Sequence, residues 1–331
     1  MANIYQQFYI QFIDIIIGCI LDLLFGDPYW FPHPVKLMGK LISLEEKIAR
    51  KFFNGKSLMV AGLIIVVVNV FISFFVPYYI LHTVKDNILL YHIINIFFIY
   101  TLIAARNLRD EAMKVYHALS RSLAEARYKL SFIVGRDTKN LDEREVIRAT
   151  VETVAENTSD GVIAPLFYVL FGTPVGFVYK MVNTMDSMLG YLNDKYKYIG
   201  FFPAKTDDIL NFLPARITGF LMVFSGILLK LDVKHAFNIM IRDRKNHKSP
   251  NCAWPEGAVA GLLKVKLGGP NYYFGELVDK PTIGDALKSL EKDDIILAIK
   301  IMFTTEVAFL SFSSLVFLLI YFFIQLLYLL K

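Results

Sequence analysis

Long apolar runs alternate with polar segments along most of the chain. Four of these runs are long enough to cross a bilayer core of roughly 30 Å as helices, at approximately Phe8–Phe25, Leu58–Leu81, Ile88–Ala105 and Phe303–Leu330. Two more, Val162–Tyr179 and Ile209–Leu229, are interrupted by Pro and Gly. Irregular backbone at membrane depth is tolerated only where protein or water satisfies it, so these two runs predict either spans or re-entrant segments.

This pattern predicts an all-α polytopic membrane protein with about four to six transmembrane or re-entrant helices. We expect residues 1–331 to form a single integral membrane domain, with its main cytoplasmic segments at 106–161 and 230–302. Amphipathic helices and Gly/Pro-rich loops in the polar segments would carry the active site.

Several polar segments show helical periodicity. Met38–Phe53 places its leucines and isoleucines on one side and its lysines on the other, which is typical of a helix at the membrane surface. Arg106–Leu130 has apolar residues at a helical period and predicts one cytoplasmic helix. Asp142 is the expected N-cap of a further helix that ends at Gly161. The Gly and Pro density of Arg242–Gly261 predicts shaped loops.

Composition and charge agree with a membrane protein. The chain is 55% hydrophobic with a mean hydropathy of +0.47. Its Lys and Arg residues concentrate between the apolar runs, at 26–57, 106–161 and 230–302. The positive-inside rule places these segments in the cytoplasm. We therefore expect a multi-pass protein of the cell membrane, with its polar motifs mainly on the cytoplasmic side and no nucleic-acid partner.

The stretch Arg148–Gly161, reading RATVETVAENTSDG, carries the densest set of acids. In a helix, Glu152 and Glu156 lie one turn apart and Asp160 lies a further turn along. Like charges at this spacing repel each other. With Asn157 beside them, the three acids suggest a Mg²⁺ site, because Mg²⁺ prefers oxygen ligands. The alternative is a solvated acidic face neutralised by nearby arginines.

Other polar candidates lie in loops. Gly26–His33 reads GDPYWFPH, and its Asp27 and His33 suggest either a general base or a histidine satisfied within the loop. The Arg-Asp pairs 136/137 and 242/243 suit phosphate binding, but each also fits a local salt bridge. The chain contains no GxxxxGK[ST], GxGxxG, HExxH or GxSxG motif. It is therefore not a recognisable P-loop ATPase, Rossmann enzyme, zinc protease or α/β-hydrolase.

Taken together, the polar blocks resemble the adenosylcobinamide-phosphate synthase family, membrane proteins of cobalamin biosynthesis. The resemblance rests on six blocks: LDLLFGDPYWFPHPVKLMG (21–39), VGRDTKNLDEREVIRATVETVAENTSDGVIAPLFY (134–168), YKMVNTMDSMLGYLNDKYKYIG (179–200), DDILNFLPARITG (207–219), SPNCAWPEGAVAGLL (249–263) and LGGPNYYFG (267–275). These blocks cover most of the chain. ENTSDG–APLFY and NTMDSM–GY are the most distinctive of them.

The resemblance implies an amide-forming ligase. Its substrates would be the free carboxylate of the corrinoid adenosylcobyric acid and aminopropanol, or its O-phosphate. ATP with Mg²⁺ would activate the carboxylate, and no tightly bound cofactor is expected. Further partners would be the lipid bilayer and other membrane enzymes of cobamide assembly. Trp254, Tyr272 and Tyr273 would pack against the corrinoid.

The candidate residues follow from these blocks. The catalytic candidates are Glu152, Glu156, Asn157, Asp160, His33 and Asp27, of which Glu152, Glu156 and Asp160 are the expected Mg²⁺ ligands. The candidates for binding substrate or nucleotide are Arg136, Asp137, Asn183, Asp186, Ser187, Arg242, Asp243, Ser249, Asn251, Trp254 and Glu256.

Two other function classes remain open on the sequence. A membrane transporter would use intramembrane acids such as Asp14, Asp22 and Asp186. A non-catalytic membrane sensor would need the fold but not the full polar set.

Overall fold

The computed structural model describes residues 2–28, 30, 33–191, 193–273 and 275–329. Within these ranges the chain is helical almost throughout, which confirms the all-α membrane class. Three helices are long and apolar enough to cross a membrane: Gly55–Thr83, Ile88–Leu119 and Asp293–Phe323. The helices Phe201–Leu210 and Phe212–Leu228 pass the same test only as a pair, either as a broken span or as a re-entrant loop.

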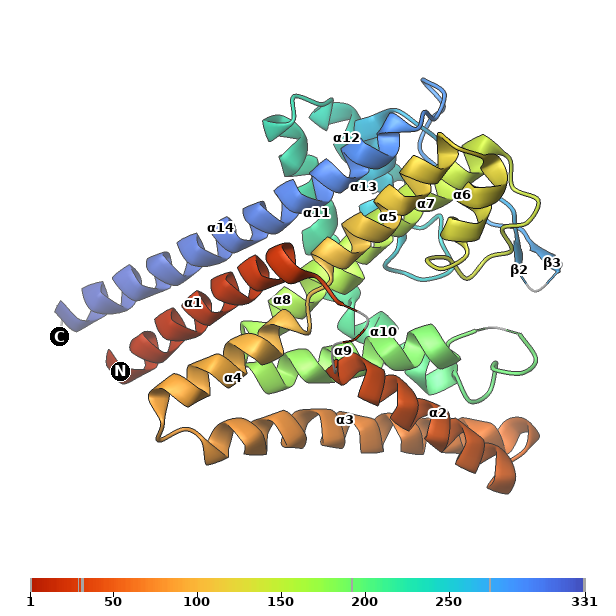
Figure 1. The fold of residues 1–331 in the computed structure, drawn as a ribbon. Coiled ribbons are helices and arrows are strands. Elements are labelled where there is room, and N and C mark those ends of the chain that lie inside the picture. Colours follow the sequence, from red (N-terminus) through yellow and green to blue (C-terminus); the bar gives the residue numbers. More distant parts are fainter. Residues whose placement is uncertain (1, 29, 31–32, 192, 274, 330–331) are drawn as a thin grey trace. The chain divides into compact units, whose positions relative to one another are not determined.

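Figure 1 labels most of the elements that follow. The helices are α1 (Ala2–Phe25), α2 (Pro34–Phe52), α3 (Leu58–Thr83), α4 (Ile88–Tyr100), α5 (Ala105–Leu119), α6 (Leu123–Leu130), α7 (Glu143–Thr158), α8 (Ala164–Val169), α9 (Thr173–Leu189), α10 (Phe201–Leu210), α11 (Phe212–Leu228), α12 (Val233–Asp243), α13 (Ala253–Leu263) and α14 (Asp293–Leu329). The short strands are β1 (Leu267–Gly268), β2 (Asn271–Tyr273), β3 (Glu276–Val278) and β4 (Thr282–Ile283).

The chain forms two compact units. Unit 1 comprises Met1–Phe8, Asn107–Ser159 and Leu213–Lys331, and unit 2 comprises Tyr9–Arg106 and Asp160–Phe212. Each unit is therefore assembled from segments that are far apart in the sequence.

In unit 2, helix α9 packs against α2, α3, α4, α8 and α10. Close helix contacts depend on small residues: a Cβ on Gly62 of α3 would lie 2.2 Å from the Ile199 carbonyl oxygen. A buried polar network ties α1 to α4 and α9. Asn95 donates to Asp14 (2.7 Å), which also contacts the His92 ring (2.9 Å), and Thr173 donates to Asn95 (2.6 Å). Acids in apolar helices need such partners.

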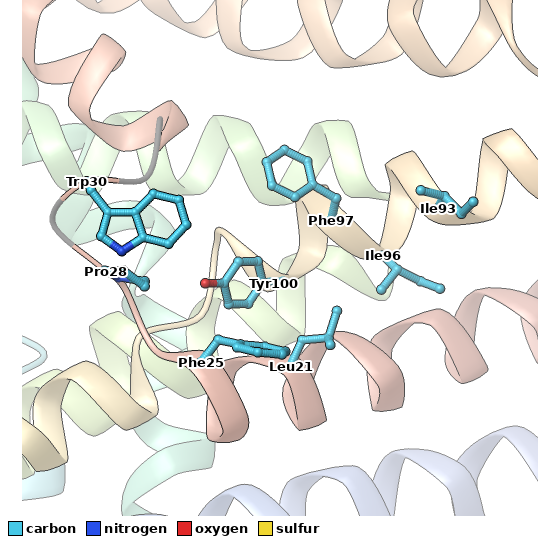
Figure 2. A pocket seen from close by; sticks show the side chains of 8 residues that line it. All are labelled: Leu21, Phe25, Pro28, Trp30, Ile93, Ile96, Phe97 and Tyr100. Atoms are coloured by element: carbon cyan, nitrogen blue, oxygen red, sulfur yellow. The ribbon is translucent and has the colours of Figure 1, made fainter.

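Unit 2 also holds an apolar pocket of about 410 Å³, shown in Figure 2. Its walls come from α1, α4 and the loop after α1, and the residues that line it are Leu21, Phe25, Pro28, Trp30, Ile93, Ile96, Phe97 and Tyr100. The one hydroxyl in this wall belongs to Tyr100 and donates to the Gly26 carbonyl. The remaining surface therefore suits apolar groups only. Tyr29, Phe31 and Pro32 of the same loop lie outside the described residues.

In unit 1, α13 packs against α7, α12 and α14, and α7 also packs against α6 and α14. The α12–α13 contact is close because a Cβ on Gly261 would lie only 2.4 Å from the Ala236 Cα. The strands form two antiparallel pairs, β1 with β4 and β2 with β3. The strands fold the segment that follows α13 back over unit 1, because β1 contacts α7 and β4 contacts α13.

Three local predictions were wrong. Arg106–Leu130 is two helices, because Ser122 accepts the Glu125 amide hydrogen (3.1 Å) and starts α6 as its N-cap. Gly161 does not end the helical path: it lies inside a π-helical turn at Ser159–Ile163, a conformation found often at functional sites. Residues 253–263 form helix α13 and not a loop, because their small residues allow the close packing on α12 described above.

The close approach at Gly62 predicts a stability effect. Gly62→Ala gains helix propensity but forces its Cβ into the backbone of Ile199, and this overpacking should cost about 1–3 kcal/mol. Thermal unfolding of the purified protein in detergent would show it as a lower midpoint. Gly39→Ala in α2 is the matched control, because its nearest neighbour is the flexible Met188 sulfur at 3.6 Å. Equal midpoints for the two variants would contradict the packing argument.

Candidate active site

Helix α7 carries the central acids of unit 1 into its interior. The helix starts with a capping box: Asp142 accepts the Glu145 amide hydrogen (2.8 Å), and the Glu145 carboxylate accepts that of Asp142 (2.8 Å). Most of the residues that follow are buried. The helix therefore cannot present Glu152 to solvent, and only a protein partner can satisfy that carboxylate.

Glu152 has such partners on both oxygens. Arg136 donates to its Oε2 (2.5 Å), and the Gly268 amide donates to its Oε1 (2.7 Å). Arg136 also donates to Asn271 (3.0 Å), and Arg148 donates to the same amide oxygen (3.1 Å) and to the Gly268 carbonyl (2.7 Å). This buried network fixes the loop at 136 and strands β1 and β2 against α7.

Beside this network lies a cavity of about 210 Å³. Its lining combines carboxylates, cations and amides: Ile133, Val134, Gly135, Arg136, Glu152, Thr153, Glu156, Asn157, His247, Glu256, Gly268, Asn271, Tyr273 and Lys280. All of these residues belong to unit 1. Lys280 donates to the Tyr273 hydroxyl (2.9 Å), which holds its ammonium group at the β2 wall.

The carboxyl groups of the cavity differ in burial and in their partners. Glu256 is buried, and this burial, together with the charges of Glu152 and Glu156, raises the pKa of its carboxyl well above the ordinary value. These effects favour the neutral form of the Glu256 carboxyl. Glu156 is only partly buried, and the Cys252 thiol donates to its Oε1 (3.0 Å).

His247 is also neutral. Burial lowers its pKa, although the Glu156 charge opposes the shift. Its Nδ1 accepts the Ser249 amide hydrogen (3.1 Å), so the ring proton is on Nε2. In this tautomer His247 is a donor and not a base.

The remaining unit 1 candidates do not line this cavity, and several have structural contacts. Arg242 forms ion pairs with Asp243 (2.7 Å) and Asp285 (3.0 Å), and Asp243 also accepts the Gly284 amide hydrogen (2.8 Å). Asp137 accepts the Gly275 amide hydrogen (2.7 Å) and so holds the β2–β3 turn.

Near α13, Ser249 and Asn251 belong to the turn that leads from His247 into the helix. The Arg216 guanidinium donates to Asn251 (3.2 Å) and lies 5.0 Å from the centre of the Trp254 ring. Trp254 is thus part of a cation–π contact in unit 1. The candidates Ser249, Asn251 and Trp254 do not line the cavity.

Six candidates belong to unit 2: Asp27, His33, Asp160, Asn183, Asp186 and Ser187. His33 accepts the Val35 amide hydrogen at Nδ1 (3.3 Å), and its Nε2 lies 3.2 Å from Asp27. His33 therefore caps α2, and its accepting nitrogen is occupied. The Asn183 amide donates to Asp207 (3.4 Å).

The Mg²⁺ ligand set stays a prediction. Within the described ranges, no group of three or more His, Cys, Asp or Glu side chains is arranged to hold a metal ion. Glu152 already uses both oxygens on protein donors.

The comparisons with known proteins agree with this arrangement of motifs. The family model described as "CobD/Cbib protein" matches residues 15–302. The chain belongs to the CobD/CbiB family. A cobalamin biosynthesis protein CobD from Clostridium tetani is 53% identical over 297 residues, covering 89% of this chain and 94% of the relative.

More distant members of the CobD/CbiB family match over a similar length. CobD from Listeria monocytogenes serotype 4b is 48% identical over 299 residues, covering 89% of this chain and 95% of the relative. The cobalamin biosynthesis protein CbiB of Salmonella typhi is 45% identical over 294 residues, covering 88% and 92%. These names support a role in cobalamin biosynthesis. No solved structure matches the chain.

The sequence did not single out some residues that line the cavity. His247, Asn271 and Lys280 lie in or just beyond the Gly/Pro-rich segments, and only the density of turn residues there indicated a shaped site. Tyr273 was expected to pack on a corrinoid. In the structure it positions Lys280.

The Glu152 network predicts a large stability effect. Glu152→Gln leaves the buried Arg136 charge without its partner, which should cost about 3–5 kcal/mol. Glu156→Gln is the matched control on the next turn and should change stability little, because Glu156 contacts no arginine among the described residues. The measurement is thermal unfolding in detergent. A Glu152→Gln protein as stable as Glu156→Gln would show that the ion pair does not support the fold.

The raised pKa of the Glu256 carboxyl predicts that its contribution to stability depends on pH. A carboxyl with a raised folded-state pKa favours folding at low pH, and this contribution is lost as pH rises through that pKa. Glu256→Gln keeps the size and stays neutral, so it should raise the unfolding midpoint more at pH 8 than at pH 5. An equal change at both values would mean that Glu256 is ionised in the folded protein.

Proposed function

We propose that this CobD/CbiB protein is an amide-forming ligase of cobalamin biosynthesis. It would join aminopropanol, as its O-phosphate, to the free carboxylate of adenosylcobyric acid, with ATP as the activating co-substrate. The observation that carries this proposal is the unit 1 cavity, which combines Arg136 and Lys280 with three carboxyl groups in one small space.

The size and charge of the cavity suit a phosphate-bearing substrate. A cavity of about 210 Å³ is smaller than the usual drug-sized pocket, so it would take a phosphate group or the amino alcohol phosphate and not a whole corrinoid. Arg136, Lys280 and the Nε2–H of His247 are donors for phosphate oxygens. The corrinoid would present only its carboxylate here.

The chemistry proceeds in two balanced steps. The carboxylate oxygen attacks the terminal phosphorus of ATP, which forms an acyl phosphate and releases ADP. The amine nitrogen then attacks the acyl carbon, the C–O bond to phosphate breaks, and inorganic phosphate leaves. Donors such as Arg136 and His247 would stabilise the charge that develops on oxygen. Mg²⁺ would enter as part of the nucleotide substrate, and no residue is assigned to it.

The amine must lose a proton during the attack. Glu156 is the best candidate base, because it is the carboxylate of the cavity that lacks an arginine partner among the described contacts. A positioned base contributes about 10²–10⁴-fold to such a step. Asn157 lies next to it on the cavity wall, while its amide donates to the Thr153 carbonyl (2.9 Å).

The test is direct turnover. Membranes containing the protein are incubated with adenosylcobyric acid, aminopropanol phosphate and Mg²⁺-ATP, and the amidated corrinoid is measured by mass spectrometry. Glu156→Gln should lower the turnover rate by about 10²-fold or more, since it removes the base. Glu276→Gln, on the exposed strand β3, is the control and should leave the rate unchanged.

Two outcomes would count against the proposal. No product, under conditions where a relative turns over, would rule out the ligase reaction. Full activity of Glu156→Gln would keep the ligase but remove Glu156 from the chemistry.

A further inference from the structure

Helix α2 of unit 2 has three distinct faces. Met38, Ile42 and Ala49 are buried against the rest of the unit. Four apolar side chains next to this face are exposed: Leu37, Leu44, Ile48 and Phe52. The four lysines of the helix, Lys36, Lys40, Lys47 and Lys51, are exposed and fall within an arc of about 60° at 100° per residue. The lysine face therefore borders the exposed apolar face along the whole helix.

The acids of α2 do not neutralise this lysine face. Glu45 accepts a hydrogen bond from Asn69 of α3 (2.5 Å). Glu46 accepts from Arg50 on its own helix (2.8 Å), and Arg50 also donates to the Lys195 carbonyl (2.9 Å). Both carboxylates of α2 thus have partners on other sides of the helix.

The lysines also line a shallow surface pocket of about 490 Å³. Its lining residues are Lys36, Gly39, Lys40, Ser43, Leu44, Lys47 and Met188. Gly39 leaves the floor open between the lysines, and the sulfur of Met188 lies below it, 3.6 Å from where a Cβ on Gly39 would be. Three ammonium groups and one hydroxyl around an open floor suit a phosphate group.

The position of α2 indicates where this phosphate would come from. The hydrogen bond between Glu45 and Asn69 places α2 alongside α3, within the membrane-span candidate Gly55–Thr83. Exposed residues near the start of α3, such as Val60 and Ile64, are apolar like the exposed face of α2. A helix with an apolar face next to lipid and lysines along its edge places those lysines at the headgroups.

We propose that the lysine face of α2 is a binding site for anionic phospholipid. The phosphate-bearing headgroup occupies the pocket between Lys36, Lys40 and Lys47, and the acyl chains lie along Leu44 and the neighbouring exposed apolar residues. Anionic lipids are attracted to basic segments of this kind beside membrane spans. None of its residues lines the unit 1 cavity, and the site does not depend on the proposed ligase reaction.

The test compares two spin-labelled lipids bound to the full-length protein. The protein is reconstituted in phosphatidylcholine, and electron paramagnetic resonance measures the immobilised fraction of labelled phosphatidylglycerol and of labelled phosphatidylcholine. The wild type should prefer phosphatidylglycerol several-fold. Lys36→Gln, Lys40→Gln and Lys47→Gln combined should bring the two fractions close to equality.

The matched control is the combination Lys195→Gln, Lys197→Gln and Lys205→Gln. These three lysines are exposed in the same unit, so the control loses the same charge and should keep the preference. Equal immobilisation of both lipids by the wild type would overturn the proposal, and so would a preference that survives in the α2 variant. A preference abolished equally in both variants would show a diffuse charge effect and overturn the site.

A separate arm distinguishes lipid from soluble phosphate. Inorganic phosphate, compared with chloride at equal ionic strength, should leave the phosphatidylglycerol preference unchanged, because a headgroup anchored by its acyl chains is not displaced by a free anion. Selective loss of the preference in phosphate would assign the pocket to a soluble ligand instead.

Discussion

The buried ion pair between Glu152 and Arg136 determines the rest of unit 1. A charged carboxylate inside a packed helix is very costly without partners, and here both oxygens are satisfied. One of these partners lies before α7 in the sequence and the other, Gly268, lies more than a hundred residues after it. To satisfy both Glu152 oxygens, the segment beyond α13 must therefore return to α7, and the cavity forms where these segments meet.

The ion pair between Glu152 and Arg136 also gives the three glutamates of the cavity, Glu152, Glu156 and Glu256, different roles. Glu152 is fixed by its donors, and its charge contributes to the raised pKa of the Glu256 carboxyl. Glu156 lines the same cavity, with the Cys252 thiol as its described partner. Helices α7 and α13 thus supply three different groups within a small volume. Glu152 holds the fold together, Glu256 is a buried carboxyl with a raised pKa, and Glu156 is an available carboxylate. This division follows from burial and partners, since all three side chains are chemically identical.

The sequence predicted the features that depend on local pattern. The apolar runs identified the helices α3, α4 and α14, and Asp142 was correctly expected to cap α7. The grouping of Glu152, Glu156 and Asn157 followed from helical spacing. The contacts of Lys280 and His247 could not be predicted, because they depend on how distant segments pack. Helix α13 was missed because its Gly and Pro residues are typical of loops, whereas its close packing on α12 needs small residues.

The neutral carboxyl of Glu256 has a consequence for ligand binding. Burial is the main cause of its raised pKa, and the charges of Glu152 and Glu156 add to it. A ligand that brings an ammonium group into the cavity opposes these effects and favours the ionised carboxylate. Binding of a cationic amine would therefore expel a proton to solvent, whereas binding of a phosphate would retain it. The heat of binding of the amine would then vary with the ionisation enthalpy of the buffer. The heat of binding of phosphate would not.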